Sequence, residues 1–594
     1  MCGIFCYISA AENSLSDGEE IFQTCCPLLS SRGPDESGRL VYDSRVLLYG
    51  SVLWHQGAKL CKQPLETDRT VLLFNGDIFQ PRDDEEESDT QWLLRRIETC
   101  SEEDDLRQLF REMRGPFSVI FFRKEERRVY FARDSMGRNS LLVGRSKRAD
   151  GGLFITSVSG NIPSNDVCEL PPAGLYFVDL GAPFMTGLHP WVETDGTHTL
   201  FGSIVTASKP KRDRAPSTEK AHQVGHCHQV QAYFNFRELT HGKELPVEEA
   251  YEHLLKSPEV DRVCETLLAT LRESVKERVV RTTKYCKNCL KTMMPPQCTH
   301  PKVGVLFSGG IDCTVLALLA DEYVPADCPI DLLNVAFEKV TRDRNKQSQP
   351  VDWNVPDRLT GHSSLRELQQ LRPNRVWNFV GINVSRAELN ARQKTISNLV
   401  YPLQTVLDES LGAALWFASR GAGQVHGIPY TSPCRVLLLG SGADELFGGY
   451  TRHRTAFERS FRERQKLGDT ETEAIDWAYG ALEAELQLDW ERLPSRNLAR
   501  DDRVIGDNGV TPRTPYLQED FVASVQSLRV NQKCYYPLGV GIGDKLILRL
   551  CAYKLGLSEV CVLKKRALQF GSRIADRRQN AADLSMFLEN PSNL

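Results

Sequence analysis

A cysteine stands at position 2 of the 594-residue chain, where its type and place suit nucleophilic chemistry. Removal of the initiator methionine would leave Cys2 with a free α-amine, of pKa about 8, beside its thiol. A nucleophile in that position can use the amine as its own base. The run Gly3-Ile4-Phe5 that follows is typical of a strand whose first residue is exposed. Taken alone, Cys2 would be interpreted as a buried structural cysteine. Whether it is a nucleophile must therefore be judged from the other motifs in this part of the chain.

Asn75 and Gly76 end an apolar run, TVLLFNG, that predicts a β-strand. At a strand end, a side-chain amide and a backbone N–H can together stabilise an oxyanion. The alternative for this Asn-Gly-Asp run is a tight hairpin turn. Further polar and glycine groups accompany it in the same part of the chain: Arg32-Gly33-Pro34-Asp35, Gly38, Asp77, Ser88-Asp89, Arg133-Asp134 and Gly137.

Together these groups resemble the class II (N-terminal nucleophile) glutamine amidotransferase domain, over about residues 2–185. The resemblance implies that Cys2 attacks the side-chain amide of glutamine, giving a thioester and ammonia. It makes Asn75 and Gly76 the oxyanion hole, and it assigns the glutamine site to Asp89, which would hold the α-amine, with Asn75, Gly76 and Asp77. The family has an arginine for the α-carboxylate in a run where this chain has Trp54-His55-Gln56-Gly57.

A second candidate site is Ser308-Gly309-Gly310-Ile311-Asp312, which follows the apolar run KVGVLF and precedes a predicted helix. Small residues let the backbone wrap around a phosphate, and a helix N-terminus adds aligned N–H donors. The Gly-Lys-Ser/Thr ending of a Walker loop is missing. A lone Ser-Gly-Gly could be any flexible turn, but Ser-Gly-Gly-x-Asp between strand and helix resembles the pyrophosphate loop of ATP pyrophosphatases.

A third glycine-rich run, 439–450, also follows an apolar strand and contains Asp444. Ligands of α/β sheets bind at the C-terminal ends of the strands. Asp312 and Asp444 could therefore share one Mg²⁺ ion, which binds one or two carboxylates together with phosphate oxygens and water. The alternative makes Asp444 an ordinary helix cap.

These two runs, with Arg513-Thr514-Pro515-Tyr516-Leu517 and the helix from Asp544, resemble the synthetase domain of glutamine-dependent asparagine synthetases, and within them a divergent eukaryotic branch. The resemblance implies that ATP and Mg²⁺ activate aspartate as β-aspartyl-AMP, which ammonia then attacks. It assigns ATP binding to a set of loop and strand-end residues: Phe307, Ser308, Gly309, Gly310, Asp312, Phe337, Leu439, Gly440, Gly442, Asp444 and Lys565.

The chain departs from that family at positions with chemical roles. Ser441 stands where the family has a glutamate base, Gln518 where it has an aspartate, and the basic run 564–566 lies upstream of its catalytic lysine. Losing one acid–base group costs about 10²–10⁴ in rate. Two functions follow: an ATP- and glutamine-dependent amidotransferase, that is, an asparagine synthase-like ligase, or a degenerate synthetase that binds nucleotide or protein partners. A cyclase or an argininosuccinate-type ligase is a lesser alternative.

Two groups of potential metal ligands lie outside these motifs. Three cysteines and a histidine are a known ligand set for structural zinc, and Cys-x-x-Cys is its usual first half. Thiols also serve as small apolar side chains, and the spacing here is unusual, so packing is the preferred interpretation and zinc the alternative. For the second group a polar loop is preferred to a metal site. The groups are Cys286, Cys289, Cys298 and His300, and His222, His226, Cys227 and His228.

The elements that must position these residues fall into three parts. Residues 2–185 are mostly strands broken by turns, which predicts an α+β sandwich of antiparallel sheets. From residue 263 to 594, apolar strands alternate with helices, which predicts an α/β domain with a parallel sheet covered on both faces. The stretch 186–262 is polar and without a clear period, and predicts a linker or insertion.

Composition excludes several classes of protein. The 73 basic and 78 acidic residues give a net charge of −5, which argues against a nucleic-acid binder. The longest apolar runs fall far below the ~18 residues that span a bilayer. The 18 cysteines are sparse for a disulfide scaffold and indicate reduced thiols and a cytoplasmic location. The expected partners are therefore small molecules (glutamine, aspartate and ATP), and the oligomeric state is left open.

Overall fold

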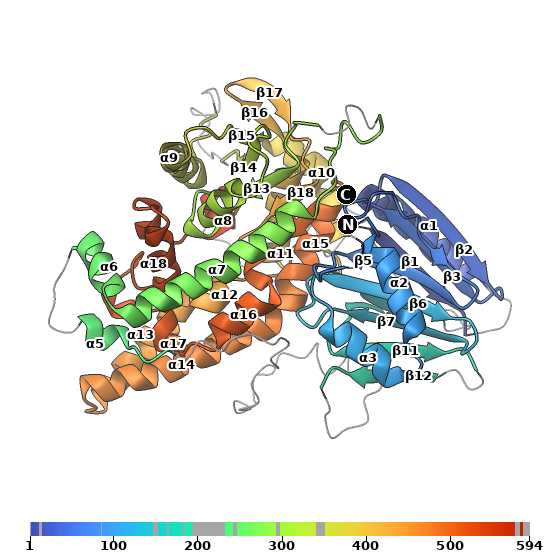
Figure 1. Cartoon of the computed structure of the whole chain (residues 1–594), viewed down its shortest axis with the longest axis horizontal. Helices are drawn as coiled ribbons and strands as arrows, with labels where there is room; N and C mark the ends of the chain where they lie inside the picture. The colour runs from blue at the N-terminus through green and yellow to red at the C-terminus, as the bar shows by residue number, and fades with distance from the viewer. Residues whose placement is uncertain are drawn as a thin grey trace.

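Within the part of the chain that the structure describes, the N-terminal residues form two β-sheets and the C-terminal residues form one, and Figure 1 shows these parts side by side. The computed structural model describes residues 2–10, 15–82, 84, 86–146, 152–162, 166–181, 185–192, 232–240, 246–292, 298–339, 351–575 and 582–585. No helix within these ranges is long and apolar enough to cross a membrane.

The N-terminal sheets are antiparallel, in the orders β10-β8-β9-β1-β3-β2 and β12-β11-β7-β6-β5-β4, which confirms the predicted sandwich. Apolar residues between Gly, Asn and Asp turns form these strands. Their bounds are β1 (Gly3–Ile8), β2 (Glu36–Tyr42), β3 (Val46–Val52), β4 (Leu65–Glu66), β5 (Thr70–Gly76), β6 (Phe117–Arg123), β7 (Arg128–Arg133), β8 (Leu142–Arg145), β9 (Leu153–Thr156), β10 (Asp166–Glu169), β11 (Gly174–Asp179) and β12 (Met185–Pro190).

Side chains from both N-terminal sheets form one core between them, which includes Ile4, Leu73 and Ile120. Helix α1 (Ser16–Arg32) covers the outer face of the sheet that contains β1, and α2 (Asp89–Thr99) and α3 (Glu103–Glu112) cover the outer face of the other. The layers are therefore helix, sheet, sheet, helix. Strands β1 and β5, one from each sheet, carry Cys2 and Asn75 at their ends.

The C-terminal sheet has the order β17-β16-β15-β14-β13-β18-β19. Its five strands β15, β14, β13, β18 and β19 run parallel to one another. Continuous apolar runs form its central strands because helices bury both faces, as predicted. The strands are β13 (Val303–Leu306), β14 (Ile330–Phe337), β15 (Trp377–Val384), β16 (Ala422–Val425), β17 (Ile428–Thr431), β18 (Val436–Leu438) and β19 (Thr511–Arg513).

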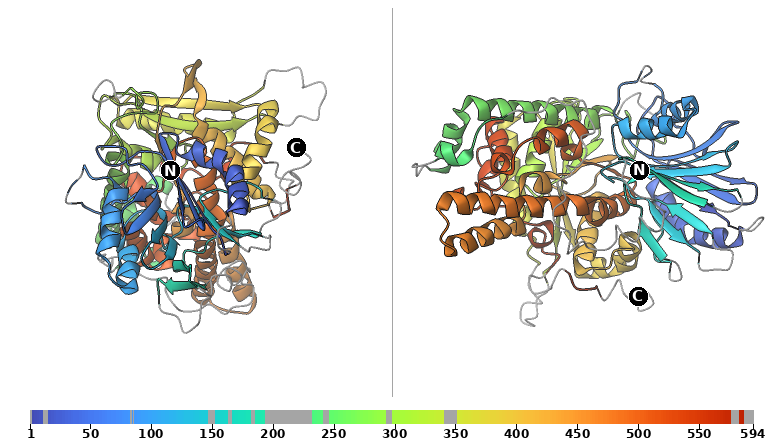
Figure 2. Two further views of the ribbon diagram at one scale, coloured as in Figure 1. Left: turned by 90° about the vertical axis from the view of Figure 1, so that its right-hand side faces the viewer. Right: turned by 90° about the horizontal axis from the view of Figure 1, so that it is seen from below.

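Helices α7, α8 and α18 pack on one face of this sheet, and α10, α11 and α15 on the other, next to the N-terminal sheets (Figure 1; Figure 2 gives two further views). A long antiparallel pair, α13 and α14, extends from the domain. The bounds are α7 (Pro258–Val280), α8 (Ile311–Asp321), α9 (Pro356–Leu371), α10 (Arg386–Val400), α11 (Val406–Arg420), α12 (Ala443–Phe447), α13 (Thr451–Lys466), α14 (Glu471–Leu493), α15 (Ala499–Gly506), α16 (Glu519–Gln526), α17 (Val530–Lys533), α18 (Leu546–Lys554) and α19 (Leu568–Gly571).

The segment 186–262, predicted to be a linker, contains regular structure where it is described. It includes most of β12, helices α5 (Phe236–Thr240) and α6 (Val247–Leu255), and the first turn of α7. Phe236 and Leu254 are fully buried in the core of the C-terminal domain. His222, His226, Cys227 and His228 lie outside the described residues. The exact domain boundaries stay a prediction.

Buried ion pairs join the two parts of the chain. The guanidinium of Arg513, on β19, donates from Nε and Nη2 to the carboxylate of Asp77 at 2.8 and 2.7 Å. Burial raises the pKa of Asp77, but Arg513 and a hydrogen bond from Gln56 outweigh burial and lower it. Further buried pairs across this interface include Arg32 with Asp502, Arg138 with Glu519, Arg435 with Asp35, and Arg503 with Glu169.

Candidate active sites

The thiol of Cys2 lies half-buried at the start of β1. Gln63 places its amide Nε2 3.8 Å from the sulfur. Two hydrogen bonds to the backbone of Phe74 fix that amide: Nε2 donates to the Phe74 carbonyl at 2.9 Å, and the Phe74 N–H donates to Oε1 at 2.7 Å. Burial raises the pKa of the Cys2 thiol, and the positive amino terminus opposes this effect. The thiol therefore needs a base to react near neutral pH.

Asn75 and Gly76 end β5 next to this thiol, because Gln63 bridges Cys2 and the residue before Asn75. The Asn75 amide donates to the hydroxyl of Ser118 at 3.3 Å, and its buried Oδ1 has no hydrogen-bond partner among the described residues. A Cβ at Gly76 would lie 2.3 Å from the carbonyl oxygen of Pro116, so only glycine fits there. The structure thus brings the predicted oxyanion residues beside the predicted nucleophile.

Asp89 begins helix α2 close to Cys2. Its Oδ1 accepts the N–H of Thr90 at 2.8 Å, and burial raises its pKa to about 6 in spite of the nearby cation Arg82. The negative charge of Asp89 raises the pKa of the Cys2 thiol, so the carboxylate and the thiol lie close enough to interact electrostatically. A carboxylate in that place can face the α-amine of an amino acid.

Arg82 is a cation that sequence reasoning missed. Its guanidinium donates to the side-chain oxygen of Gln56, and to the carbonyl oxygens of Glu87 and Ile78 at 2.6 and 3.3 Å. Gln56 lies in the run where the amidotransferase family has its carboxylate-binding arginine. Arg82 therefore delivers a guanidinium to that place from a different segment, and only its three-dimensional contact with Gln56 reveals it.

Asp77, also predicted for the glutamine site, faces the interface between the two domains. Arg513 donates to both of its carboxylate oxygens, and Gln56 Nε2 donates to Oδ1 at 2.9 Å. Its carboxylate is 1% exposed, which leaves it no open face for a ligand. In the structure Asp77 is therefore part of the domain interface, directly after β5, the strand that ends in the predicted oxyanion residues Asn75 and Gly76.

The two glycine-rich loops of the C-terminal domain approach each other closely. Gly309 has φ +79°, and a Cβ there would lie 2.5 Å from the backbone nitrogen of Gly361. Gly310 caps helix α8, so Asp312 lies in its first turn. A Cβ at Gly440 would lie 2.8 Å from the Cβ of Asp312, so the end of β18 touches the start of α8. These contacts require glycine and bring the two strand ends together.

Asp312 and Asp444 converge on Lys545. The ammonium donates to the two oxygens of Asp312 at 2.7 and 2.8 Å and lies 2.6 Å from Oδ1 of Asp444. Lys565 pairs with Oδ2 of Asp444 and lies 3.6 Å from Asp312. Burial opposes ionisation of Asp444, but the two lysines outweigh burial and lower its pKa. Lys545 has φ +54°, a strained conformation that non-glycine residues keep where the surrounding structure enforces it.

A cavity of ≈ 480 Å³ opens above these groups. Its size suits a nucleotide together with a small acid. Of the residues predicted to bind ATP, the lining includes Phe307, Ser308, Gly310, Asp312, Leu439, Gly440, Gly442, Asp444 and Lys565. Phe337 is not among the lining residues described; its ring packs on Phe417 with centroids 5.9 Å apart. Gly309 shapes the loop without lining the cavity.

Glu445 also lines the cavity and was not predicted as a site residue. Its Oε1 accepts the hydroxyl of Tyr450 at 2.7 Å and the amide of Asn497 at 3.2 Å. Burial, followed by repulsion from Asp444, raises its pKa to about 7. A carboxyl group with this pKa can exchange protons near neutral pH. Ser441, which stands where a glutamate base was expected, lines the same cavity, so a carboxyl group that can exchange protons near neutral pH lies in the cavity that lacks that base.

The two carboxylates fit a magnesium ion that carries phosphate. Mg²⁺ binds proteins through one or two carboxylates and takes its remaining ligands from phosphate and water. Asp312 and Asp444 meet that requirement because both reach a single ammonium group, Lys545 Nζ, within 2.8 Å. The lysines that neutralise them here would neutralise phosphate oxygens once the metal binds.

Comparisons with known proteins agree with this geometry. The profile of the family described as Asparagine synthase matches residues 298–588, and that described as Glutamine amidotransferase domain matches residues 1–162. Asparagine synthetase domain-containing protein CG17486 of Drosophila melanogaster is 40% identical over 98% of this chain and 100% of its own length. Asparagine synthetase domain-containing protein 1 of Homo sapiens is 34% identical over 97% of this chain and 95% of its own.

A more distant relative, asparagine synthetase domain-containing protein YML096W of Saccharomyces cerevisiae, is 27% identical over 98% of both chains. The similarity thus runs through both halves of the molecule. The N-terminal part, with its two antiparallel sheets, matches a glutamine amidotransferase domain, and the C-terminal part, with its mixed α/β structure, matches a synthetase domain. The chain therefore belongs to the family of asparagine synthetase domain-containing proteins, divergent relatives of asparagine synthetase.

Proposed function

We propose that this protein is a glutamine- and ATP-dependent amidotransferase that converts aspartate, or a similar carboxylic acid, to its amide. The observation that carries the proposal is the convergence of Asp312 and Asp444 on Lys545 at the floor of one cavity. Two glycine-lined strand ends that place carboxylates and lysines together suit a magnesium-bound triphosphate. Exchange of labelled pyrophosphate into ATP, dependent on aspartate, tests it.

In the glutaminase half, removal of Met1 would free the α-amine of Cys2 to take the thiol proton. The thiolate attacks the amide carbon of glutamine, the C–N bond breaks, and ammonia leaves with the proton. Water then hydrolyses the thioester to glutamate. The Asn75 amide and the Gly76 N–H would stabilise the oxyanion of the tetrahedral intermediates.

In the synthetase half, a carboxylate oxygen of the acid attacks the α-phosphorus of ATP and pyrophosphate leaves. Ammonia then attacks the acyl carbon and AMP departs. Bound magnesium would neutralise charge on the phosphates. Lys545 and Lys565 would stabilise the departing pyrophosphate, and the N–H groups at the start of α8 would bind phosphate oxygens.

Arg82 would hold the α-carboxylate of glutamine. Replacing Arg82 with alanine is expected to raise KM for glutamine about 10- to 100-fold with little change in kcat, since a charged hydrogen bond contributes about 1.5–3 kcal/mol. The measurement is glutamate release over a range of glutamine concentrations. Arg95→Ala is the control, because Arg95 is half-exposed and pairs with Glu87 on the same loop. An Arg82→Ala enzyme with wild-type KM would refute this role.

Glu445 would accept the proton that ammonia loses as it attacks. With a pKa of about 7, Glu445 is ionised above neutrality, so amide formation per free ammonia should rise with pH through about 7. Glu445→Gln should lower that rate about 10²-fold and remove this rise. Tyr450→Phe should shift the midpoint to higher pH, because the Tyr450 hydrogen bond lowers the pKa of Glu445. An unchanged pH profile in Glu445→Gln would contradict the assignment.

The second candidate is a nucleotide-binding module with little catalysis. Ser441 in place of a base, and lysines that already neutralise both aspartates, favour it. Pyrophosphate exchange distinguishes the two candidates. A protein that binds ATP but shows no exchange with any carboxylic acid tried would support the nucleotide-binding module.

A further inference from the structure

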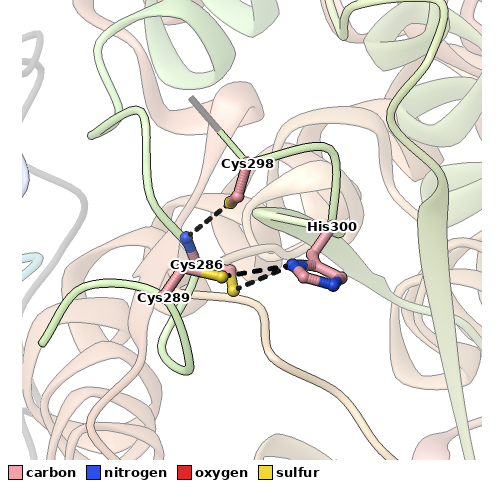
Figure 3. A group of neighbouring side chains, drawn as sticks. All are labelled: Cys286, Cys289, Cys298 and His300. Atoms are coloured by element: carbon pink, nitrogen blue, oxygen red, sulfur yellow. Dashed lines mark hydrogen bonds between the residues drawn. The ribbon is translucent and has the colours of Figure 1, made fainter. Parts of the chain in front are cut away.

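Four residues between α7 and β13 converge although eight residues separate their two pairs: Cys286, Cys289, Cys298 and His300. Their potential ligand atoms all lie within 4.8 Å of one another, and Figure 3 shows the side chains turned toward a common point. His300 Nδ1 lies 3.3 Å from the sulfur of Cys289 and 3.8 Å from that of Cys286. The backbone N–H of Cys286 donates to the sulfur of Cys298 at 3.2 Å.

We propose that these three thiols and one imidazole bind a zinc ion in a tetrahedral structural site. With Zn–S near 2.3 Å and Zn–N near 2.0 Å, tetrahedral ligands lie about 3.5–3.8 Å from one another. The two S–N distances match that spacing. The backbone N–H directed at the Cys298 sulfur stabilises a thiolate, the form in which cysteine binds metal.

The structure argues against the packing interpretation preferred from the sequence. Cys286 and Cys298 are buried, but Cys289 is only half-buried and His300 is exposed, so the group does not form an apolar core. A ring nitrogen directed at two sulfurs serves no packing purpose. The cysteines are free thiols rather than disulfides. Four protein ligands would complete a tetrahedron with no open position, which is typical of a structural site.

The metal would fasten the loop that supports the interface between the two domains. Arg513 pairs with Asp77 at the end of β5. The same guanidinium donates to the carbonyl of Arg281 at 2.9 Å and to the hydroxyl of Thr282 at 2.8 Å. Within the Cys-x-x-Cys turn, Lys287 donates from its backbone to Pro433 at 3.0 Å and from Nζ to Asn508 at 2.9 Å. This loop therefore connects α7, the start of β18 and the end of α15.

Metal analysis of the full chain tests the proposal directly. The protein, produced without an affinity tag and dialysed against metal-free buffer, is expected to retain about one zinc per chain by elemental mass spectrometry. Cys289→Ser and His300→Ala should each lose at least about tenfold in retained zinc, because the more exposed ligands can be replaced without opening the core. Cys328→Ala is the matched control: this buried thiol donates to the Cys298 carbonyl but is not a member of the group, so its zinc content should stay near one.

Cobalt gives a second reading that does not depend on any variant folding. Added to metal-free wild-type protein, Co²⁺ should produce the visible bands of a tetrahedral ion and thiolate charge-transfer absorption, which zinc abolishes. Wild-type protein that retains no more zinc than His300→Ala and gives no tetrahedral cobalt spectrum would overturn the proposal. A disulfide between Cys286 and Cys289 in freshly purified protein would do the same. None of these readings depends on amidotransferase activity.

Discussion

Replacing Cys2 with alanine is expected to abolish glutamine hydrolysis, lowering kcat/KM for glutamine by at least about 10³-fold. The thiol is the atom that would bond to the substrate, and neither neighbour can replace it: Gln63 and Asn75 carry amides that stabilise charge but do not attack carbon. Release of glutamate from glutamine, with and without ATP, measures the loss.

Two controls separate loss of the nucleophile from loss of the fold. Cys26→Ala removes a half-exposed thiol on helix α1, away from the site, and should hydrolyse glutamine at the wild-type rate. The Cys2→Ala protein should still form the amide when ammonium salt replaces glutamine, since the synthetase cavity is built from other residues. Glutaminase activity that persists in Cys2→Ala would disprove the role of Cys2. Mass spectrometry of the N-terminal peptide reports whether Met1 has been removed.

Asp312→Asn is expected to reduce acid-dependent pyrophosphate exchange by about 10²–10³-fold. The substitution keeps the shape of the side chain but removes the charge that would hold magnesium and now pairs with Lys545 at 2.7 and 2.8 Å. Asp444 alone would then face two lysines, and the metal would lose one of its two protein ligands. Exchange at saturating ATP and magnesium, followed by a magnesium titration, measures the effect.

Asp321→Asn provides the matched control for Asp312→Asn. Asp321 ends the same helix, α8, at the opposite end from Asp312, and pairs with Arg375 and Arg372 rather than with groups of the cavity. Exchange by that variant should stay near the wild-type rate. Equal rates for Asp312→Asn and wild type would show that the strand ends do not hold the nucleotide phosphates.

Much of the architecture could be predicted from the sequence because local patterns determine it. Continuous apolar runs such as 303–306 and 330–337 are buried on both faces and form parallel strands. The glycines at 309 and 442 have positive φ and make the sharp strand-to-helix turns. Helix α1 was not predicted, because an internal proline, Pro27, and a weak apolar stripe obscure its period.

The remaining parts of the candidate sites depend on contacts between residues far apart in the chain. Lys545 lies 233 residues from Asp312, and Arg513 lies 436 residues from Asp77. No local pattern predicts such pairs. Phe337 ends β14, and its side chain packs on Phe417 in the core, so its assignment to ATP binding stays a prediction that concerns its backbone.

Helix α15 connects the two candidate sites. Arg32 donates to the Cys2 carbonyl at 3.2 Å and to the carboxylate of Asp502 on α15 at 2.9 Å. The neighbouring residues Arg500 and Asp501 line the synthetase cavity. One short, buried helix therefore contacts both candidate sites.

Incubation of the purified protein with ATP, magnesium, labelled pyrophosphate and a panel of carboxylic acids asks directly whether the paired strand ends activate an acid. Label should appear in ATP when aspartate or a close analogue is present, and the signal should fall sharply in Asp312→Asn. Absence of label in ATP with every acid, under conditions where the protein binds ATP, would contradict the assignment of this cavity to acyl-adenylate formation.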